Sequence, residues 1–362
     1  MSSATNLLRS ALHVRRVHRV GLARQLSEIL RLSREPGRIG PAEYYDYRVF
    51  LDSLPYSAKR EFLGWRGEKR LEFLNQRGWH SLANDKVAFS AAMAGLGIPL
   101  PRTVALFHEQ RRHFGDVPCY GDTASLATFL RTNRVWPLFA KPVQGAYGKG
   151  TALIEGYDAR NDSLVLAHDA PRPVEDYVAH LQNPGRLGFL FQAVLAPHPA
   201  MEPICGKRLS SVRAMTVYPA SGAALHRVIW KIPVGSNITD NYHHGVAGNL
   251  IAAVDPETGI AEAPVLGIGL DCHVVERHPD TNAMLRGFAL PQWDVLKDVV
   301  LRGTRALPGL RWQHWDIAFA RDGPTVLEVN LYAGGGTDIA QVSHGKGLLD
   351  DTLSRLVRDS PP

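Results

Sequence analysis

The chain alternates between apolar residues at helical spacing and short apolar runs typical of strands. Helical spacing, with an apolar residue every three or four positions, covers residues 5–34, 42–51, 57–76, 87–95, 123–132, 175–181, 291–307 and 347–357. Runs rich in β-branched and aromatic residues predict strands at 103–107, 188–195, 210–218, 224–233 and 248–254. Helices and strands are therefore mixed along the whole length, and no internal repeat is visible.

The most informative strand pair is predicted at 311–332. Two apolar stretches flank an Asp-Gly-Pro turn there, which is typical of a β-hairpin. Asp316 lies on the first strand, while Glu328 and Asn330 share one face of the second, because side chains alternate along a strand. Pairing these strands brings three oxygen ligands around one point, which suits Mg²⁺. The alternative is the polar, solvent-facing side of an ordinary hairpin.

A second hairpin, at 135–155, has a glycine-rich turn that follows Lys141. The turn contains Gly145, Gly148, Lys149 and Gly150. Glycines let anionic oxygens approach backbone N–H groups closely, and the lysine adds positive charge. Ordinary hairpin turns also use glycine, so a phosphate site and a plain turn both stay open.

Three further cations accompany these hairpins. Lys86 belongs to Asn84-Asp85-Lys86, which is predicted to cap the helix at 87–95. Arg213 and Lys231 fall on neighbouring predicted strands. Strand cations usually face solvent, but these two belong to a sheet that also ends in Asp316 and its partners.

Positive charge and apolar residues coincide in the first 40 positions. The formal net charge of the chain is +6, and eight arginines before residue 40 face only Glu28 and Glu35. The same segment carries Leu8, Leu12, Leu22, Leu26, Ile29 and Leu30. A basic amphipathic helix of this kind binds an anionic membrane surface, docks on a partner or packs on its own protein. No nucleic-acid-binding motif accompanies the charge, so nucleic acid is not expected as a partner.

Length and composition limit the number of domains and the class of protein. With 362 residues, 45% of them hydrophobic, the chain can bury a large core spread over two or three domains. Neither a transmembrane run nor a signal peptide is evident, and the three cysteines are widely spaced. These features predict a reduced, cytoplasmic protein without a disulfide framework or zinc site.

The order of these groups resembles the ATP-grasp superfamily, and more narrowly the sugar-transfer associated ATP-grasp proteins. The resemblance extends from about Leu26 to the C-terminus. It rests on EYYDYRVF at 43–50, NDK at 84–86, FAKP with the glycine loop, LSSVRAMTVYP at 209–219, TDNYHHG at 239–245, HPDT at 278–281 and HWDIAFARDGPTVLEVN at 314–330. The most specific part of the resemblance is Asp316 followed by the pair Glu328 and Asn330, which one residue separates. The segment after TDNYHHG lacks the double glycine expected in relatives, which would reshape the acceptor site.

The resemblance implies an α+β fold in which two lobes hold ATP between them, preceded by a helical extension. It implies regions 1–80 (helical), 81–190 (first lobe, with the glycine loop) and 191–362 (second lobe, with the metal site). Implied contacts to ATP are Lys86, Lys141, Gly145, Gly148, Lys149, Gly150, Gln192, Val194 and, at the ribose, Glu202. Implied catalytic groups are Arg213, Lys231 and His314, and implied Mg²⁺ ligands are Asp316, Glu328 and Asn330.

The implied activity is that of a carboxylate–amine ligase that works through an acylphosphate on a small molecule, sugar or peptide. A polysaccharide or natural-product pathway would use such chemistry. A phosphotransferase with a hydroxyl acceptor and a nucleotide-binding protein without turnover are the alternatives.

Overall fold

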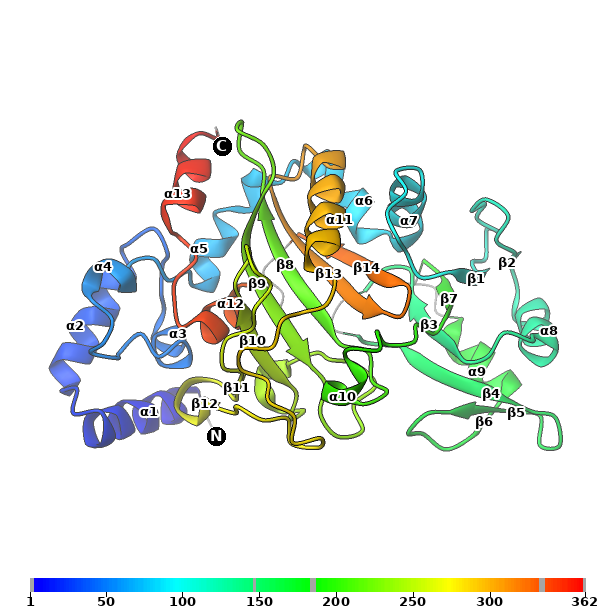
Figure 1. Cartoon of the computed structure of the whole chain (residues 1–362), viewed down its shortest axis with the longest axis horizontal. Coiled ribbons are helices and arrows are strands. Elements are labelled where there is room, and N and C mark those ends of the chain that lie inside the picture. Colours follow the sequence, from blue (N-terminus) through cyan, green and yellow to red (C-terminus); the bar gives the residue numbers. More distant parts are fainter. Residues whose placement is uncertain (1–2, 146–147, 183–186, 332–335, 361–362) are drawn as a thin grey trace.

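The structure, a computed structural model, describes residues 3–145, 148–182, 187–331 and 336–360. Within these ranges the strands form two seven-stranded sheets, with a group of helices beside the second sheet (Figure 1). The expected mixture of helices and strands in two lobes, preceded by N-terminal helices, is confirmed.

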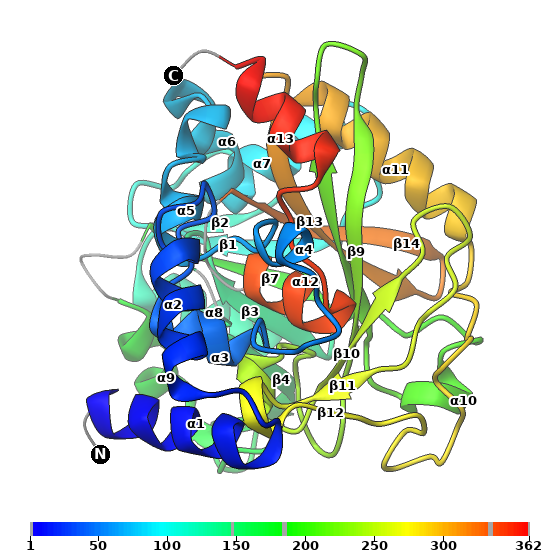
Figure 2. The same cartoon turned by 90° about the vertical axis from the view of Figure 1, so that its left-hand side faces the viewer.

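The N-terminal segment forms two helices, α1 (Ser3–Val17) and α2 (Leu22–Leu32), so the single helix expected there is wrong. Between them, Arg19 adopts a left-handed conformation with φ 59°. The buried side chain of Gln25 donates to the carbonyl of Val20 at 2.7 Å, which holds the turn. Figure 2 shows both helices on one outer end of the molecule.

The next segment is more broken than its spacing predicts. It contains the short helices α3 (Pro41–Asp46), α4 (Tyr56–Lys59), α5 (Trp65–Lys69) and η1 (Glu72–Leu74). The single helix expected over 57–76 does not form, because backbone groups there bond to distant partners. The Leu63 N–H donates to the side chain of Gln341 at 2.6 Å, and the Gly64 N–H donates to the Gly37 carbonyl at 2.7 Å. Aromatic residues of this region, with the inner faces of α1 and α2, form a separate core.

The first sheet has the order β2-β1-β7-β3-β4-β5-β6. Its strands are β1 (Thr103–Phe107), β2 (Cys119–Tyr120), β3 (Leu138–Pro142), β4 (Ala152–Asp158), β5 (Ser163–Leu166), β6 (Arg172–Pro173) and β7 (Phe189–Ala193). Helices α8 (Thr123–Thr132) and α9 (Val174–Leu181) share a hydrophobic core with alternate residues of this sheet, such as Leu138 and Ala140. The intervening residues of β3, Phe139 and Lys141, therefore face the other way. The lobe boundary expected between residues 190 and 191 falls inside β7.

The second sheet has the order β12-β11-β10-β9-β8-β13-β14 and is antiparallel throughout. Its strands are β8 (Ser211–Val217), β9 (Ala224–Ile232), β10 (Leu250–Val254), β11 (Val265–Leu266), β12 (His273–Val274), β13 (Trp312–Ala320) and β14 (Gly323–Asn330). The hairpin predicted around Asp316 is thus present, as β13 and β14; Tyr332 at its end lies outside the described residues.

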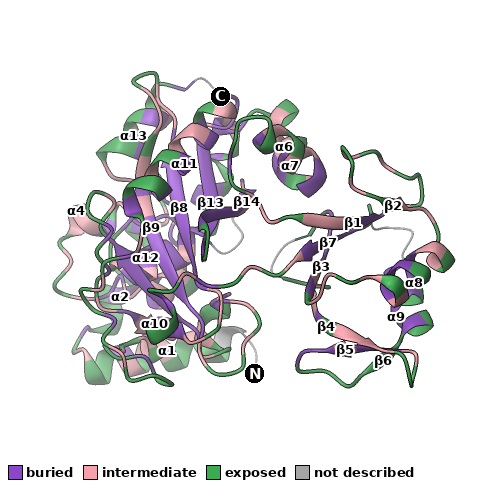
Figure 3. Ribbon diagram, turned by 45° about the vertical axis from the view of Figure 1, so that its right-hand side comes forward, coloured by how far each residue is buried: buried purple, intermediate pink, exposed green. Residues whose placement is uncertain are grey.

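Helices cover both faces of this sheet. The largest core joins α7 (Lys86–Ala94) and α11 (Trp293–Ala306) to one face, while α12 (Thr337–His344) and α13 (Asp351–Arg358) join the core on the other. Figure 3 shows the buried central strands β8, β9 and β13 between these layers. The remaining short helices are α6 (His80–Asn84), α10 (Glu202–Cys205), η2 (Arg77–Trp79), η3 (His243–Gly245) and η4 (Gly269–Asp271). The sequence did not predict α12.

Strand alternation explains which residues reach the space between the sheets. On β8, Val212 and Ala214 pack toward α11, so Arg213 points to the opposite face. On β13, Trp315 and Ile317 pack toward α11 in the same way, which sends Asp316 to the face of Arg213. On each strand, the apolar residues pack toward α11, and the charged residues between them therefore point to the opposite face of the sheet.

Candidate active site

A cavity of about 610 Å³ lies between the two sheets and is lined by residues of both. Its volume is within the usual range for small-molecule sites, roughly 300–1,000 Å³. Most of the residues expected to bind a nucleotide, and all three expected metal ligands, line this one cavity. Residues nearly 250 positions apart in the sequence, such as Lys86 and Asn330, are thereby brought to one site.

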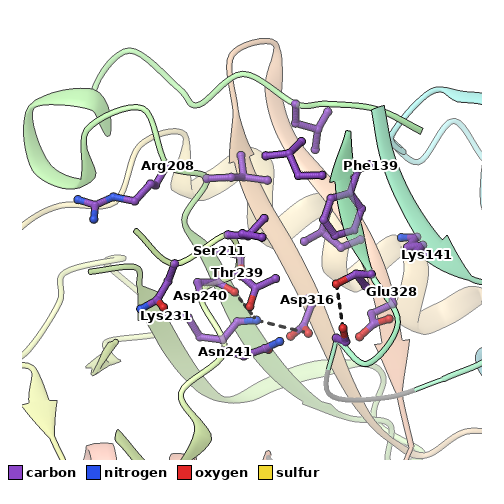
Figure 4. Close-up of a pocket in the computed structure, with 18 of the residues that line it drawn as sticks. Phe139, Lys141, Arg208, Ser211, Lys231, Thr239, Asp240, Asn241, Asp316 and Glu328 are labelled. Atoms are coloured by element: carbon purple, nitrogen blue, oxygen red, sulfur yellow. Dashed lines mark hydrogen bonds and ion pairs between the residues drawn. The ribbon is translucent and has the colours of Figure 1, made fainter. Parts of the chain in front are cut away.

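One part of the cavity is apolar. Phe139 on β3 is paired across the sheet with Leu153 on one side and Gln192 on the other, so these three side chains lie on the same face. Val194, whose backbone N–H donates to the Pro137 carbonyl at 3.4 Å, follows directly after β7. Leu195, Leu209 and Leu327 add further apolar lining. A flat aromatic ring fits such a slot, and Figure 4 shows Phe139 well separated from Lys231 and Asp240.

Two lysines lie near Glu328. Lys86 Nζ is 3.3 Å from Glu328 Oε2 and donates to the carbonyl of Gly145 at 3.2 Å, so it links the second sheet to the glycine loop. Lys141 is buried at the end of β3, and burial lowers its pKa to about 8; the Glu328 carboxylate opposes this shift. An anion placed here would restore the charged form of Lys141.

A second charged group connects three strands of the second sheet. Arg213 donates to both carboxylate oxygens of Asp316, at 2.8 and 2.7 Å. Lys231 Nζ lies 3.2 Å from Asp240 and 3.5 Å from Asp316 (Figure 4). Burial opposes ionisation of Asp316, but the charges of Arg213 and Lys231 outweigh burial and lower its pKa. Asp316 is therefore ionised at physiological pH and accepts the hydrogen bonds of Arg213 as a carboxylate.

The three expected metal ligands lie on neighbouring positions of β13 and β14. Asp316 is the direct cross-strand partner of Glu328, and Asn330 Nδ2 is 3.4 Å from Glu328 Oε1. Two carboxylates and one amide oxygen are hard ligands that fit Mg²⁺. Asp316 already accepts both bonds from Arg213, yet each carboxylate oxygen has a second lone pair for a metal. In the described part of the chain no group of three or more His, Cys, Asp or Glu side chains is close enough to hold a metal, so this mixed set is the candidate.

The glycine loop reaches toward the second sheet. Gly148 and Gly150 adopt left-handed conformations, with φ 67° and 74°. A Cβ added at Gly148 would lie 3.1 Å from Asn241 Nδ2, so glycine permits this close approach. Gly145 and Lys149 also line the cavity. Ala146 and Tyr147, in the middle of the expected loop, lie outside the described residues.

Three expected site residues are not among the described residues that line the cavity: Gly150, Glu202 and His314. Glu202 begins α10, is 3.9 Å from Arg321, and is not among the described residues that line the cavity. His314 is also absent from that lining; its Nδ1 is buried and has no hydrogen-bond partner among the described residues. Burial, reinforced by the charge of Arg213, lowers the pKa of His314 to about 3. His314 is therefore neutral at physiological pH, and a cationic role for it does not fit the structure.

The structure adds residues that sequence reasoning missed. Asp338, at the start of α12, lines the cavity and lies 3.6 Å from His244 Nδ1. Its Oδ1 is buried without a partner among the described residues. Ser211 donates to Asp240, which positions that carboxylate next to Lys231. The aspartate and asparagine at 240 and 241 were noted only as part of a motif, and Asp338 carried no signal beyond the preceding run of glycines.

The family model described as sugar-transfer associated ATP-grasp matches residues 68–355. No curated protein matches the sequence. Similar solved structures include VanG D-Ala:D-Ser ligase from Enterococcus faecalis, with 12% identity, a TM-score of 0.44, and coverage of 78% of this chain and 63% of that one. For L-amino acid ligase from Bacillus licheniformis the identity is 14%, the TM-score 0.42, and the coverages 77% and 49%. For D-alanine–D-alanine ligase from Bacillus anthracis the identity is 12% and the TM-score 0.42, and the match covers 84% of this chain and 76% of that one. This chain thus spans less than two thirds of the length of the first two of these proteins.

Proposed function

Since this chain belongs to the family of sugar-transfer associated ATP-grasp proteins, we propose that it is an ATP- and Mg²⁺-dependent ligase that joins a carboxylate to an amine through an acylphosphate. The observation that carries the proposal is the convergence of four buried cations with two carboxylates, one buried and one half-buried, in one cavity beside an apolar slot. The cations are Lys86, Lys141, Arg213 and Lys231, and the carboxylates are Asp316 and Glu328. Phosphoryl transfer asks a protein mainly for positioning and charge neutralisation, which these groups supply.

ATP would lie with its base in the apolar slot and its phosphates over the lysines. Phe139 and Leu327 would contact the two faces of the adenine, and the backbone that follows β7 would bond its edge. Lys86 and Lys141 would bind phosphate oxygens as charge-assisted donors. The N–H groups of the loop around Gly148 would cover the phosphates.

Asp316, Glu328 and Asn330 would hold Mg²⁺. When bound, the ion would supply positive charge that offsets the charge of the phosphates during transfer. Arg213, fixed by its two bonds to Asp316, points at the same region and cannot turn away from it. Lys231 is held in the same way by Asp240.

The reaction would proceed in two steps. In the first, an oxygen of the substrate carboxylate bonds to the γ-phosphorus while the bond from phosphorus to the bridging β-oxygen breaks, which gives an acylphosphate and ADP. Arg213 and Lys231 would stabilise the charge on the phosphoryl oxygens during this transfer. In the second, a neutral amine attacks the acyl carbon, phosphate leaves, and the amine proton passes to that phosphate. No nucleophilic side chain is required.

The acceptor would bind at the part of the cavity lined by residues 235–244 and Asp338. The Asp338 carboxylate, whose Oδ1 is buried without a partner among the described residues, favours a ligand that donates hydrogen bonds, as an amine does. Amino acids, amino sugars and peptides are the substrate classes with such a group. The cytoplasm, where ATP is available and the three free cysteines stay reduced, is the compartment we propose.

Hydroxylamine tests the proposal because it captures acylphosphates as hydroxamates. The protein is incubated with Mg-ATP, hydroxylamine and a panel of amino acids and sugar acids, while ADP and hydroxamate are measured. We expect at least one carboxylate to give equal amounts of both products, and the Glu328→Gln variant to give neither. ADP release together with a phosphorylated hydroxyl, seen by ³¹P NMR, would identify a phosphotransferase. ATP binding without ADP release for any carboxylate or hydroxyl compound would favour a protein without turnover.

A further inference from the structure

Each of the two N-terminal helices exposes leucines. Leu8 is 60% exposed, and Leu12 47%. On α2, Leu22, Leu26 and Leu30 recur at every fourth position and are 37%, 59% and 47% exposed. We call these five residues the leucine surface. Packing on the protein's own lobes, one of the alternatives for these leucines, therefore does not account for them.

The leucine surface cannot turn inward, because the opposite sides of both helices are already fixed. Val14 of α1 and Leu32 of α2 are fully buried in the N-terminal core. Gln25 is 1% exposed and accepts a hydrogen bond from Tyr45 at 2.8 Å. Glu28 pairs with the buried Lys59 at 2.9 Å. Residues four apart share one side of a helix, so the buried positions and the leucines occupy different sides.

The charge on α1 and in the turn that follows it is of one sign. No acidic residue precedes Glu28, while exposed arginines lie at positions 9, 15, 16 and 19. The ion pairs of the described residues include none with these four arginines; Arg24, in contrast, pairs with Glu28 and Asp52. A row of apolar side chains flanked by arginines is typical of helices that lie in the interface of an anionic membrane.

We propose that α1 and α2 dock this protein on a membrane surface that contains anionic lipids. The leucine surface would enter the boundary between headgroups and acyl chains, and the four arginines would contact the lipid phosphates. A second copy of the chain is a poorer partner, since it would bring the same positive charges together. Among the described residues no helix is long and apolar enough to span a bilayer.

The docking surface is separate from the candidate active site. In Figures 1 and 2, α1 and α2 lie at the end of the molecule opposite the first sheet. None of their described residues lines the cavity between the sheets. A docked molecule therefore keeps its cavity clear of the lipid, and the proposal stands independently of the proposed function.

Sedimentation of the full-length protein with vesicles tests the docking. One set contains phosphatidylcholine only and the other 30 mol% phosphatidylserine, each at low and high salt. We expect binding to the anionic vesicles, weakened about tenfold or more between roughly 50 and 500 mM salt because screening shortens the reach of the arginines. Absence of binding to anionic vesicles at low salt would overturn the proposal, as would equal binding to both sets.

Matched variants locate the contact. The double variant Leu26→Ser, Leu30→Ser should bind vesicles about tenfold or more weakly than the wild type. Each change removes apolar surface that the lipid would otherwise bury. The control is Leu96→Ser, at an equally exposed leucine (48%) outside the surface, which should bind as the wild type does. Equal binding by the double variant and the control would overturn the proposal. Thermal unfolding of each variant establishes that it is folded.

A parallel pair tests the charge. Arg15→Gln with Arg16→Gln should reduce both the affinity for anionic vesicles and its salt dependence, whereas Arg77→Gln with Arg305→Gln should change neither. A dimer in size-exclusion chromatography that the Leu26 and Leu30 changes dissociate would instead identify the leucine surface as a self-association interface and overturn the membrane assignment.

Discussion

Lys141 offers the most direct test of the nucleotide site. Replacing it with methionine keeps the apolar stem and removes the charge. Burial lowers the pKa of Lys141 from an ordinary value of about 10.4 to about 8. That difference corresponds to about 3 kcal/mol of unfavourable free energy for keeping the charged amine in the ligand-free fold at neutral pH. Lys141→Met should therefore unfold at the same or a higher temperature than the wild type.

ATP binding should respond in the opposite direction. A charge-assisted contact to phosphate contributes about 1.5–3 kcal/mol, so the dissociation constant of ATP should rise about 10- to 150-fold in Lys141→Met. Titration calorimetry measures this, with the exposed Lys346→Met as the control. Unchanged ATP affinity in a folded Lys141→Met variant would remove Lys141 from the phosphate site.

The pH dependence supplies an independent check. With a pKa near 8, Lys141 is mostly charged at pH 7 and mostly neutral at pH 9, so wild-type affinity for ATP should fall about tenfold over this range. Binding near pH 8 should take up a proton, visible as a dependence of the calorimetric heat on the buffer. For folding the sign is reversed: between about 8 and 10.4 the unfolded chain binds more protons, so the contribution of Lys141 to stability increases with pH. Lys141→Met should lack all three effects, and a wild-type affinity that is flat up to pH 9 would refute the reasoning.

Other residues give shorter tests. Glu328→Gln should abolish ADP release at millimolar Mg²⁺ without unfolding the protein, because one anionic ligand is lost; wild-type turnover would place the metal elsewhere. Arg213→Lys should lower kcat about tenfold or more with little change in the KM for ATP, and an effect on KM alone would make Arg213 a ground-state contact. Alanine is unsuitable at that position, since the buried Asp316 would keep only Lys231, at 3.5 Å, as a cationic partner, and breaking a buried ion pair costs about 3–5 kcal/mol. Lys231→Gln should behave like Arg213→Lys in the same steady-state assay. Since the pKa of His314 is about 3, His314→Gln should leave the shape of the pH–rate profile between pH 5 and 8 unchanged; a displaced acidic limb would show that protonated His314 takes part.

Local sequence pattern predicted the hairpin of β13 and β14 well. Alternating apolar residues and an Asp-Gly-Pro turn determine both the strands and the face on which Asp316 and Glu328 lie, so the pairing seen in the structure follows from neighbours in sequence. The glycine loop and the capping segment at 84–86, in which the structure makes Asp85 the N-cap, were also recognisable, since each depends on a few adjacent residues.

Features that depend on distant partners were not predictable. The bidentate pair of Arg213 with Asp316 joins residues 103 positions apart, and only the sheet order brings them together. The break in the N-terminal helix depends on Gln25 and a core formed with Tyr45, which no local spacing reveals. Burial, which makes His314 neutral, is likewise a property of the assembled layers.

The pairing of cations with carboxylates in the cavity has a consequence for the order of ligand arrival. Lys86 is paired with Glu328, and Arg213 with Asp316, so each of these groups already has a counter-ion within the protein. ATP alone would bring its phosphates against two carboxylates, and Mg²⁺ alone would enter among fixed cations. If ATP and Mg²⁺ bind together, the phosphates would pair with the cations and the metal with the carboxylates. No charge would then be left unpaired in the low-dielectric interior. We therefore expect positive linkage between nucleotide and metal: each should bind more tightly in the presence of the other, by the same factor.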